Sequence, residues 1–359
     1  MLTSSEAVSK WHPDKMADEV ADYLMENVLA VDPKAHTGIE VLLKGDTCVL
    51  SGEVKANHKG NFEYADSAKY LLFFLEPWKT YHVIDLISRQ SPEIDHAVSH
   101  NRFKKTGAGD QGIMVGYANT TNVYEMPREY ALACEIVRIL ENDTIENHQT
   151  RLLGDAKSQV TLDEHGGIDN MVISACTSPD WTTKEKYVRE YIKRLVLAKQ
   201  KDYPDLAVSD LSQTHWLILP GGLWNVGGPD ADCGLTGRKT VADAYGPLVA
   251  NGGGAQAGKD PSKVDRSGFL MARHIAKDVL LQGDNAKQRL AVSVQLSYAI
   301  GVPEPVGVKV VDSNGKDYTA WVRAMYDLTP DGIYKTLDLA HRHFHGLSLW
   351  EEENYGVSI

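Results

Sequence analysis

Two short segments of the sequence combine an acid and a cation in a way that suits ligand chemistry. His12-Pro13-Asp14-Lys15 places a possible proton donor beside a carboxylate of the kind that binds metals. The same four residues fit the start of a helix equally well, because proline suits the first turn and aspartate can cap it. Asp155-Ala156-Lys157 places a second acid and cation at the entrance of an expected strand. Each segment alone is a weak signal.

A longer region is rich in glycine and in charge of both signs. Glycine is dense from residue 220 to residue 258, which allows close approach of backbone to a ligand but also fits ordinary turns. Five basic residues and five aspartates lie between positions 230 and 266: Arg238, Lys239, Lys259, Lys263 and Arg266, with Asp230, Asp232, Asp243, Asp260 and Asp265. Such cations can hold a polyphosphate, and the aspartates can hold Mg²⁺ together with phosphate oxygens. The charge pattern alone favours surface ion pairs on loops.

Three further patterns match known motifs only in their letters. Gly107 to Gly112 fits G-x-G-x-x-G, but a polar segment precedes it and a strand pattern follows it, the reverse of a dinucleotide site. Gly253 to Lys259 fits a phosphate-binding loop, yet Asp260 follows where Ser or Thr is needed for magnesium. Two-residue spacing splits His341, His343 and His345 between helix faces, which favours a solvated edge over a metal tract.

Composition excludes several classes of protein. The 37 basic and 49 acidic residues among 359 give a net charge of −12, which argues against a nucleic-acid binder. An anionic ligand then requires a local cationic cluster. No apolar run approaches the roughly 18 residues of a membrane span, and the N-terminus lacks the apolar core of a signal peptide, so we expect a cytoplasmic protein. The four cysteines are widely spaced and indicate neither a disulfide framework nor a zinc knuckle.

Hydrophobic periodicity predicts the elements that must position these residues. Helices are expected over residues 15–29, 64–75, 128–140, 184–198 and 269–281. Strands are expected over residues 38–43, 47–54, 112–117, 158–162, 170–175 and 291–298, the first two as a hairpin. Strand pairs followed by helices, without strict alternation, favour an α+β fold. The polar stretch from Ile94 to Thr106 is either a mobile lid or a connector, and its length favours the connector.

Taken together, six segments resemble S-adenosylmethionine synthetases (methionine adenosyltransferases), in the order in which that family has them. They are SSEAVSKWHPDK from Ser4, GAGDQG from Gly107, DAKSQVT from Asp155, DCGLTGRK from Asp232, GGGAQAGKDPSKVDRS from Gly252 and SYAIGVPEP from Ser297. The segments span most of the chain. The resemblance implies condensation of ATP with L-methionine by attack of sulfur on ribose C5′. Hydrolysis of the released triphosphate to pyrophosphate and phosphate would follow.

The resemblance also implies roles for single residues. The catalytic group is implied to be His12, Lys157, Arg238 and Lys259. ATP contacts are implied for His12, Asp155, Lys157, Trp224, Asp232, Arg238, Lys239, Ala255 and Lys259. Methionine contacts are implied for Glu53, Gln90, Asp110, Asp232 and Lys263. Two Mg²⁺ per site are implied at Asp14 and Asp265, and K⁺ at Glu40. The stretch after Gln90 corresponds to the family's mobile loop, so the lid replaces the connector as our interpretation.

The same resemblance implies architecture and assembly. It predicts an α+β fold of three similar domains with approximate threefold symmetry, over residues 1–98, 106–222 and 223–359. It also implies a homodimer, or a dimer of dimers, whose active sites lie between subunits. The expected partners are therefore ATP, L-methionine and a second copy of the chain, with no nucleic acid and no membrane.

Several positions depart from the family pattern. Lys10-Trp11 stand where Glu-Gly usually precedes the histidine, and Leu223-Trp224 stand where Arg-Phe is usual. Cys176-Thr177, Asn251 and Thr329 also differ, and the C-terminus is shorter than usual. Because the metal and core phosphate residues are kept, we expect the chemistry to be retained with altered affinity or kinetics. Two alternatives are a catalytically silent nucleotide-binding paralogue that regulates a true synthetase, and a different ATP-using enzyme such as a kinase or triphosphatase.

Overall fold

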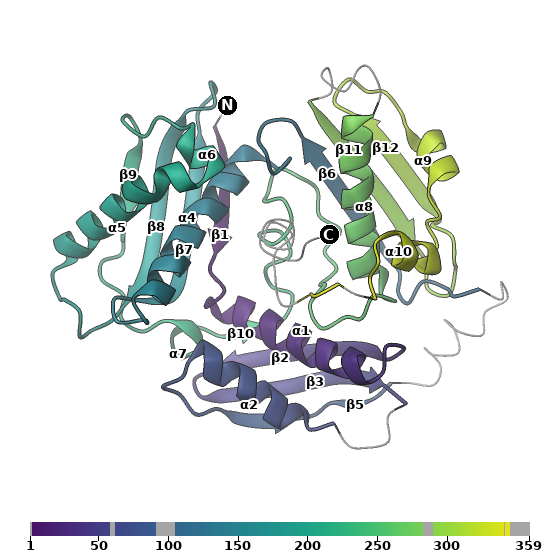
Figure 1. Cartoon of the computed structure of the whole chain (residues 1–359), viewed down its shortest axis with the longest axis horizontal. Helices are drawn as coiled ribbons and strands as arrows, with labels where there is room; N and C mark the ends of the chain where they lie inside the picture. Colours follow the sequence, from purple (N-terminus) through teal and green to yellow (C-terminus); the bar gives the residue numbers. More distant parts are fainter. Residues whose placement is uncertain (1, 58–61, 91–104, 283–289, 341, 345–359) are drawn as a thin grey trace.

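The computed structural model describes residues 2–57, 62–90, 105–282, 290–340 and 342–344. These residues form three units of sheet and helix around a common centre (Figure 1), which confirms the α+β class and the three-unit architecture. Residues 91–104 lie outside the described residues and include most of the predicted lid, the stretch from Ile94 to Thr106; His341 and His345 also lie outside them.

The first unit carries the hairpin that the sequence predicts. Its sheet has the order β10-β2-β3-β4, with β5 also paired to β3. The strands are β2 (His36–Lys44), β3 (Thr47–Lys55), β4 (His82–Asp85), β5 (Ser88–Arg89) and β10 (Gly234–Leu235). Helices α1 (Pro13–Val31) and α2 (Tyr64–Leu75) pack on it. Alternate residues of β2, such as Ile39 and Val41, point into this core.

The second unit is built on a four-stranded sheet of order β1-β7-β8-β9. Its strands are β1 (Thr3–Val8), β7 (Leu152–Leu162), β8 (Ile168–Thr177) and β9 (His215–Ile218). Helices α4 (Arg128–Glu146) and α5 (Glu185–Lys199) cover one face (Figure 1), followed by the 3₁₀ turn Gln200–Asp202 and the short helix α6 (Pro204–Ala207).

The third unit is a three-stranded antiparallel sheet of order β12-β11-β6. Its strands are β6 (Gly112–Asn119), β11 (Ala291–Tyr298) and β12 (Gly307–Asp312). Helix α8 (Val264–Leu281) packs along β6 and β11, and α9 (Thr319–Met325) and α10 (Pro330–Thr336) complete the unit. A single turn, α7 (Gly228–Ala231), lies at the edge of the first unit.

The three sheets exchange strands across the chain. The N-terminal strand β1 pairs with β7, β6 pairs with β11, and β10 pairs with β2. The ranges 1–98, 106–222 and 223–359 therefore do not each enclose one sheet, and as sequence boundaries they stay a prediction. The consequence for chemistry is that residues from all three ranges meet at the junctions.

Most predicted elements are present, with different ends. Helix α2 and strand β11 have the predicted bounds, whereas α8 begins at Val264 instead of Phe269 and α4 continues to Glu146 instead of Leu140. The first turn of α8 contains buried Asp265, Arg266 and Ser267, whose polarity hid the helix start. Thr329 caps α10, because its Oγ1 accepts a hydrogen bond from Gly332 N–H at 3.1 Å.

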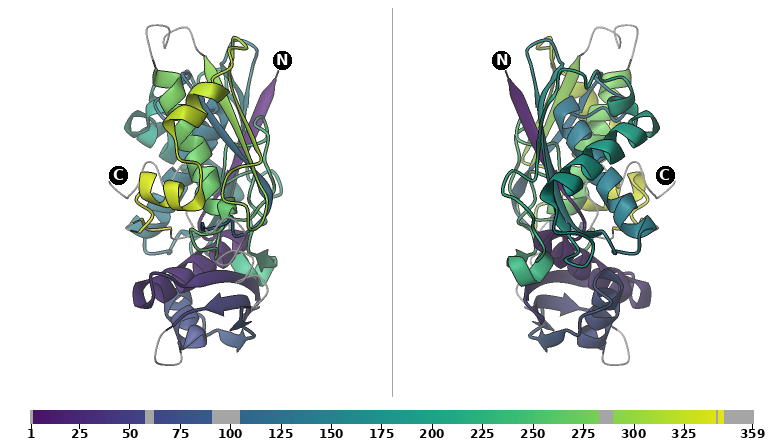
Figure 2. Two further views of the ribbon diagram at one scale, coloured as in Figure 1. Left: turned by 90° about the vertical axis from the view of Figure 1, so that its right-hand side faces the viewer. Right: turned by 90° about the vertical axis from the view of Figure 1, so that its left-hand side faces the viewer.

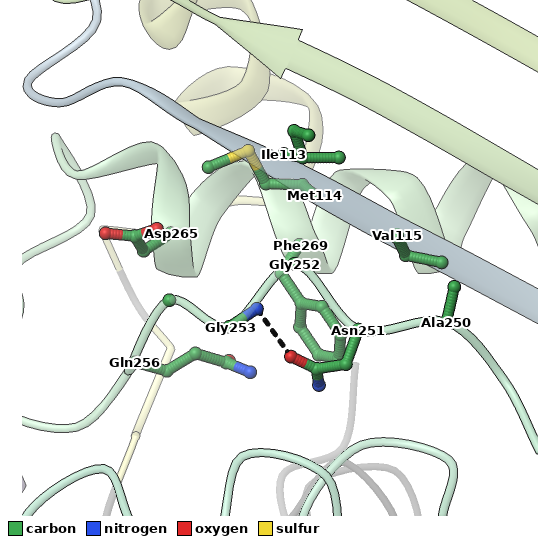
Figure 3. Close-up of a pocket in the computed structure, with 11 residues that line it drawn as sticks. Ile113, Met114, Val115, Ala250, Asn251, Gly252, Gly253, Gln256, Asp265 and Phe269 are labelled. Carbon is green, nitrogen blue, oxygen red and sulfur yellow. Dashed lines mark hydrogen bonds between the residues drawn. The ribbon is translucent and has the colours of Figure 1, made fainter. Parts of the chain in front are cut away.

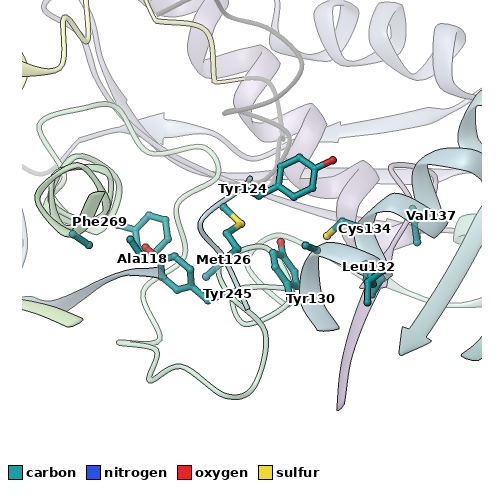
Figure 4. Packing of buried hydrophobic residues seen from close by; sticks show 14 of the residues in the cluster. Ala118, Tyr124, Met126, Tyr130, Leu132, Cys134, Val137, Tyr245 and Phe269 are labelled. Atoms are coloured by element: carbon teal, nitrogen blue, oxygen red, sulfur yellow. The ribbon is translucent and has the colours of Figure 1, made fainter. Parts of the chain in front are cut away.

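The apolar core is continuous between the second and third units. Figure 4 shows Tyr130 and Met126 of the second unit near Tyr245 and near Phe269, a residue of helix α8 in the third unit. In Figure 2 the described helices of these two units lie on one side of their sheets. Among the described residues, no helix is long and apolar enough to cross a membrane.

Candidate active site

His12 and Asp14 meet at the N-terminus of helix α1. His12 is the N-cap residue with extended backbone angles, and its Nδ1 atom accepts a hydrogen bond from Asp14 N–H at 3.2 Å. Both side chains are almost completely buried. Since Nδ1 accepts a hydrogen bond, the ring proton of the neutral imidazole is on Nε2, which leaves Nε2–H as a donor.

The surroundings keep this imidazole neutral. Burial, together with the charges of Lys157 and Lys239, lowers the pKa of His12 to about 3, against the opposing charges of Asp14 and Asp232. At neutral pH the ring therefore offers a hydrogen bond without a formal charge. A neutral donor near two cations suits an oxygen that gains negative charge.

Asp14 forms the centre of a cationic cluster. Its Oδ2 lies 2.5 Å from Lys239 Nζ, its Oδ1 accepts a hydrogen bond from Leu235 N–H at 3.0 Å, and Arg238 Nη1 is 3.8 Å away. Burial alone would raise the pKa of Asp14, but the Lys239 and Leu235 hydrogen bonds outweigh burial, so the pKa is lowered. Asp14 is therefore a carboxylate held ready for cations.

Three aspartates on one face of α1 hold the glycine-rich segments. Asp14, Asp18 and Asp22 are spaced by four residues, and they accept backbone N–H groups from Leu235, Gly237 and Gly258 at 3.0, 2.8 and 2.7 Å. Burial raises the pKa of Asp18 to about 7. We did not single out Asp18 and Asp22 from the sequence, although their spacing with Asp14 was the available signal.

A second acid and cation pair lies at the start of helix α8. Asp265 Oδ2 is 2.5 Å from Lys259 Nζ, and Asp265 is buried. Figure 3 shows its carboxylate beside the loop 252–256 and strand β6. A Cβ at Gly254 would lie 2.0 Å from Asp265 Oδ1, so only glycine allows the backbone to approach this carboxylate. Asn251 supports the loop by accepting a hydrogen bond from Gly253 N–H at 2.6 Å.

Lys263 forms an ion pair with another aspartate, Asp260. Its Nζ lies 2.6 Å from Asp260 Oδ2, which also accepts a hydrogen bond from Thr37 N–H at 2.7 Å. Asp260 is fully buried. Burial alone would raise its pKa, but the charge of Lys263 and contact with His36 lower it well below the usual range. Asp260 was not predicted as a site residue, and it orients Lys263.

Several of the residues assigned to ATP by resemblance lie near His12 and Asp14. Asp155 Oδ2 accepts a hydrogen bond from Gly228 N–H at 2.7 Å, while its buried Oδ1 has no hydrogen-bond partner among the described residues. Burial raises the pKa of Asp155 to about 6. Lys157 is exposed on β7, Asp232 is exposed after α7, and Trp224 is partly exposed. The backbone O of Trp224 accepts a hydrogen bond from Thr177 N–H at 2.8 Å.

The other predicted site residues lie on sheets or loop ends. Glu40 is exposed on β2, and Glu53 is opposite Gly38 in the β2–β3 register. Gln90 N–H donates to Val54 O at 3.2 Å, which places Gln90 beside the end of β3. Asp110 Oδ1 accepts a hydrogen bond from Gln111 N–H at 2.7 Å. The side chain of Ala255 lies against Gly237, because a Cβ at Gly237 would be 2.5 Å from Ala255 Cβ.

The structure therefore places the predicted residues in two groups. The His12 group contains His12, Asp14, Asp155, Lys157, Asp232, Arg238 and Lys239, linked by contacts and by mutual effects on pKa. The Asp265 group contains Lys259 and Asp265 beside the loop 252–256. Within the described residues, no hydrogen bond or ion pair joins the two groups. A pocket of about 370 Å³ adjoins the His12 group and is lined by Arg238, Lys239, Ser5 and Gln159.

Comparison with known proteins covers almost the whole chain. The family models for the N-terminal, central and C-terminal domains of S-adenosylmethionine synthetase match residues 1–73, 105–224 and 226–352. An S-adenosylmethionine synthase from Desulfosudis oleivorans is 36% identical, over 94% of this chain and 89% of the relative. One from Borreliella afzelii is 35% identical, over 94% and 88%. The solved structure of an unusual S-adenosylmethionine synthetase from Campylobacter jejuni has 30% identity and a TM-score of 0.83, over 98% and 92%.

Proposed function

The chain belongs to the S-adenosylmethionine synthetase family and is a methionine adenosyltransferase, and from this premise we propose how its residues carry out the reaction. The sulfur of L-methionine attacks ribose C5′ of ATP. The new S–C5′ bond forms as the C5′–O bond breaks, and triphosphate leaves with the bonding electrons. The same site then hydrolyses the triphosphate to pyrophosphate and phosphate.

The observation that carries this proposal is the neutral His12 at the centre of a cationic group. Because sulfur attacks carbon directly, the reaction needs no serine or cysteine nucleophile. The protein must align sulfur with C5′ and stabilise charge on the departing oxygen. His12 Nε2–H is the donor assigned to that oxygen, since its Nδ1 is already engaged with Asp14 N–H.

Different side chains are assigned to the two ends of ATP. Lys157, Arg238, Lys239 and Lys259 are assigned to the triphosphate, whose charge would replace the pairing of Lys239 and Lys259 with aspartates. Trp224 is assigned to the adenine ring, because any base offers a face for stacking. Asp155, Asp232 and Ala255 complete the assigned ATP contacts, and the unpartnered Oδ1 of Asp155 is available to accept a ligand hydrogen bond.

Methionine is assigned to a separate set of side chains. Asp110 would receive its ammonium group, and Lys263 would lie near the methionine and phosphate region. Glu53, Gln90 and Asp232 are assigned to the rest of the amino acid. The buried Gln90 Oε1 atom has no hydrogen-bond partner among the described residues, which leaves it an acceptor for a ligand donor.

The acidic residues of the site suit Mg²⁺ that is held partly by protein carboxylates and partly by the phosphates of the substrate. Among the described residues no cluster of three or more His, Cys, Asp or Glu could form an all-protein metal cage. Mg²⁺ is commonly held by one or two carboxylates plus substrate phosphates, which is what Asp14 and Asp265 offer. The two Mg²⁺ ions would neutralise charge on the triphosphate. Glu40 is assigned to K⁺ as a single exposed carboxylate.

We propose that the working unit is a homodimer, alone or as a dimer of dimers. The His12 and Asp265 groups carry complementary parts of one triphosphate site, but no hydrogen bond or ion pair joins them within the described part of the chain. Glu40, Lys157 and Gln159 are exposed on their sheets, away from the apolar core. If the exposed sheet faces of two subunits packed against each other, the His12 group of one subunit would lie beside the Asp265 group of the other.

The proposal is tested by incubating purified protein with ATP, L-methionine, Mg²⁺ and K⁺ while following products. We expect S-adenosylmethionine, pyrophosphate and phosphate in equal amounts. Phosphate release without a sulfonium product would identify a triphosphatase or kinase instead. ATP binding without any product would identify a silent paralogue. Magnesium binding is tested separately by the thermal shift that Mg²⁺ adds to tripolyphosphate binding in wild type and in Asp14→Asn.

A further inference from the structure

Trp11 occupies the turn that leads into His12, and its indole points into the protein. The side chain is 5% exposed, and its Nε1–H donates a hydrogen bond to Leu75 O at 3.0 Å. Leu75 is the last residue of α2, so the indole satisfies a carbonyl that the end of a helix leaves without an intrahelical partner. The bulky residue beside the histidine is therefore directed away from the ligand side.

The indole also packs tightly on strand β7. A Cβ at Gly154 would lie 2.4 Å from Trp11 Cδ2, so the ring rests directly on the backbone of that glycine. Gly154 precedes Asp155, which is assigned to ATP. Two hydrogen bonds join the turn to the same strand: Ser9 N–H donates to Ala156 O at 2.9 Å, and Ala156 N–H donates to Ser9 Oγ at 3.0 Å.

These contacts close a ring of interactions around the ligand-facing residues. His12 N–H donates to Ser9 O at 2.9 Å, which ties the histidine to the turn. On the other side, Glu76 follows Leu75, and its Oε1 would lie 3.3 Å from a Cβ at Gly228. Gly228 N–H in turn donates to Asp155 Oδ2 at 2.7 Å. Trp11 is the side chain that touches both the β7 side and the α2 side of this ring.

We propose that Trp11 is a positioning residue that fixes His12 relative to Asp155, through its hydrogen bond to Leu75 O and its packing on Gly154. The inference rests on the proposed function of these two residues and goes beyond it, because Trp11 is not among the residues assigned to ATP or methionine. Small errors of placement lower the rate of a step that depends on alignment more than they lower binding. The triphosphate cations Lys239 and Lys259 are held by other contacts, to Asp14 and Asp265.

The test compares two activities in Trp11→Phe, which keeps an aromatic ring but removes the N–H donor. We expect kcat for S-adenosylmethionine formation to fall about tenfold. The KM for ATP and the rate of hydrolysis of added tripolyphosphate should stay within about twofold of wild type. Trp11→Gly, which also removes the packing, should lower the sulfonium-forming rate further. Both variants are assayed well below their own unfolding temperatures.

Trp181→Phe is the matched control, because Trp181 is a partly buried tryptophan that packs on Tyr187 and Tyr191 of the second unit. We expect wild-type kinetics for it. A wild-type kcat in folded Trp11→Phe would overturn the positioning role, as would an equal loss of both activities. Failure of the proposed function is distinguishable, because the wild-type protein itself would then make no S-adenosylmethionine.

Discussion

Lys239 Nζ lies 2.5 Å from Asp14 Oδ2, although 225 residues separate them in the chain. Lys259 and Asp265 form the same contact at the same distance. Each aspartate is the second residue of a long helix, α1 or α8, where the helix dipole favours negative charge. The two pairs are thus counterparts in two of the three similar units.

Replacing Lys239 with methionine keeps most of the side-chain volume and removes its charge. We expect the affinity for tripolyphosphate to fall about tenfold or more, since a charge-assisted contact contributes roughly 1.5–3 kcal/mol. Titration calorimetry with tripolyphosphate and Mg²⁺ measures the change. Lys309→Met is the control, because Lys309 forms an exposed ion pair with Asp317. Unchanged affinity in Lys239→Met would contradict the assignment.

Mixing inactive variants tests whether the site is shared between subunits. His12→Ala and Lys259→Met damage different groups, so a mixed dimer would contain one site with both defects and one intact site. After co-refolding of equal amounts, about half the dimers are mixed, and we expect about one quarter of wild-type activity. His12→Ala mixed with Asp14→Asn, which damages the same group, should stay inactive. Equal results for the two mixtures would place each complete site within one chain.

Trp224→Ala tests the stacking role. Loss of a stacked base costs roughly 1–3 kcal/mol, so we expect the KM for ATP to rise about tenfold. Hydrolysis of added tripolyphosphate, which has no base, should be unaffected. Trp224→Phe should recover most of the ATP affinity. Steady-state kinetics on the two substrates separates these outcomes, and an equal effect on both substrates would argue against stacking.

Stability should depend on pH through Asp205. Burial, together with the charge of Glu135, raises the pKa of Asp205 from 3.8 to about 7, against the opposing charge of Arg128. The folded state therefore binds this proton more tightly than the unfolded state, and stability falls as the pH rises from about 4 to about 7. Asp205→Asn should reduce that slope, by at most about 1.4 kcal/mol per pH unit. Denaturation at several pH values measures it.

Exposed Asp169→Asn serves as the control for this titration. It should leave the slope unchanged. A slope in Asp205→Asn equal to that of wild type would show that other groups control stability in this range.

The spacing of apolar residues in the sequence predicted helices and strands that bury one face and expose the other. Helix α2 has the predicted bounds because its apolar spacing ends at Glu76-Pro77, and strand β11 has them because buried and more exposed residues alternate along it. The start of α8 was missed because Asp265 and Arg266 are polar yet buried. Arg266 forms an ion pair with Asp22 of helix α1, which is 244 positions away in the sequence. Burial of that kind depends on tertiary contacts that no local window contains.

The candidate site shows the same division. The chemistry of His12, Asp14 and the lysines could be inferred from residue types and motif order. The tautomer of His12 could not, because it depends on the backbone geometry of the cap. Nor could the pairing of β1 with β7, which brings the turn of Ser9 and His12 beside Asp155 and joins residues 149 to 159 positions apart.

The central claim is that His12 assists departure of the triphosphate from C5′. A single-turnover experiment with His12→Ala, following S-adenosylmethionine while ATP binding is measured separately, tests it most directly. We expect the sulfonium-forming rate to fall about 10²–10³-fold, as for loss of one donor to a developing oxyanion. ATP affinity and hydrolysis of added tripolyphosphate should be largely retained, and exposed His343→Ala should behave as wild type. An unchanged sulfonium-forming rate in His12→Ala would contradict the account.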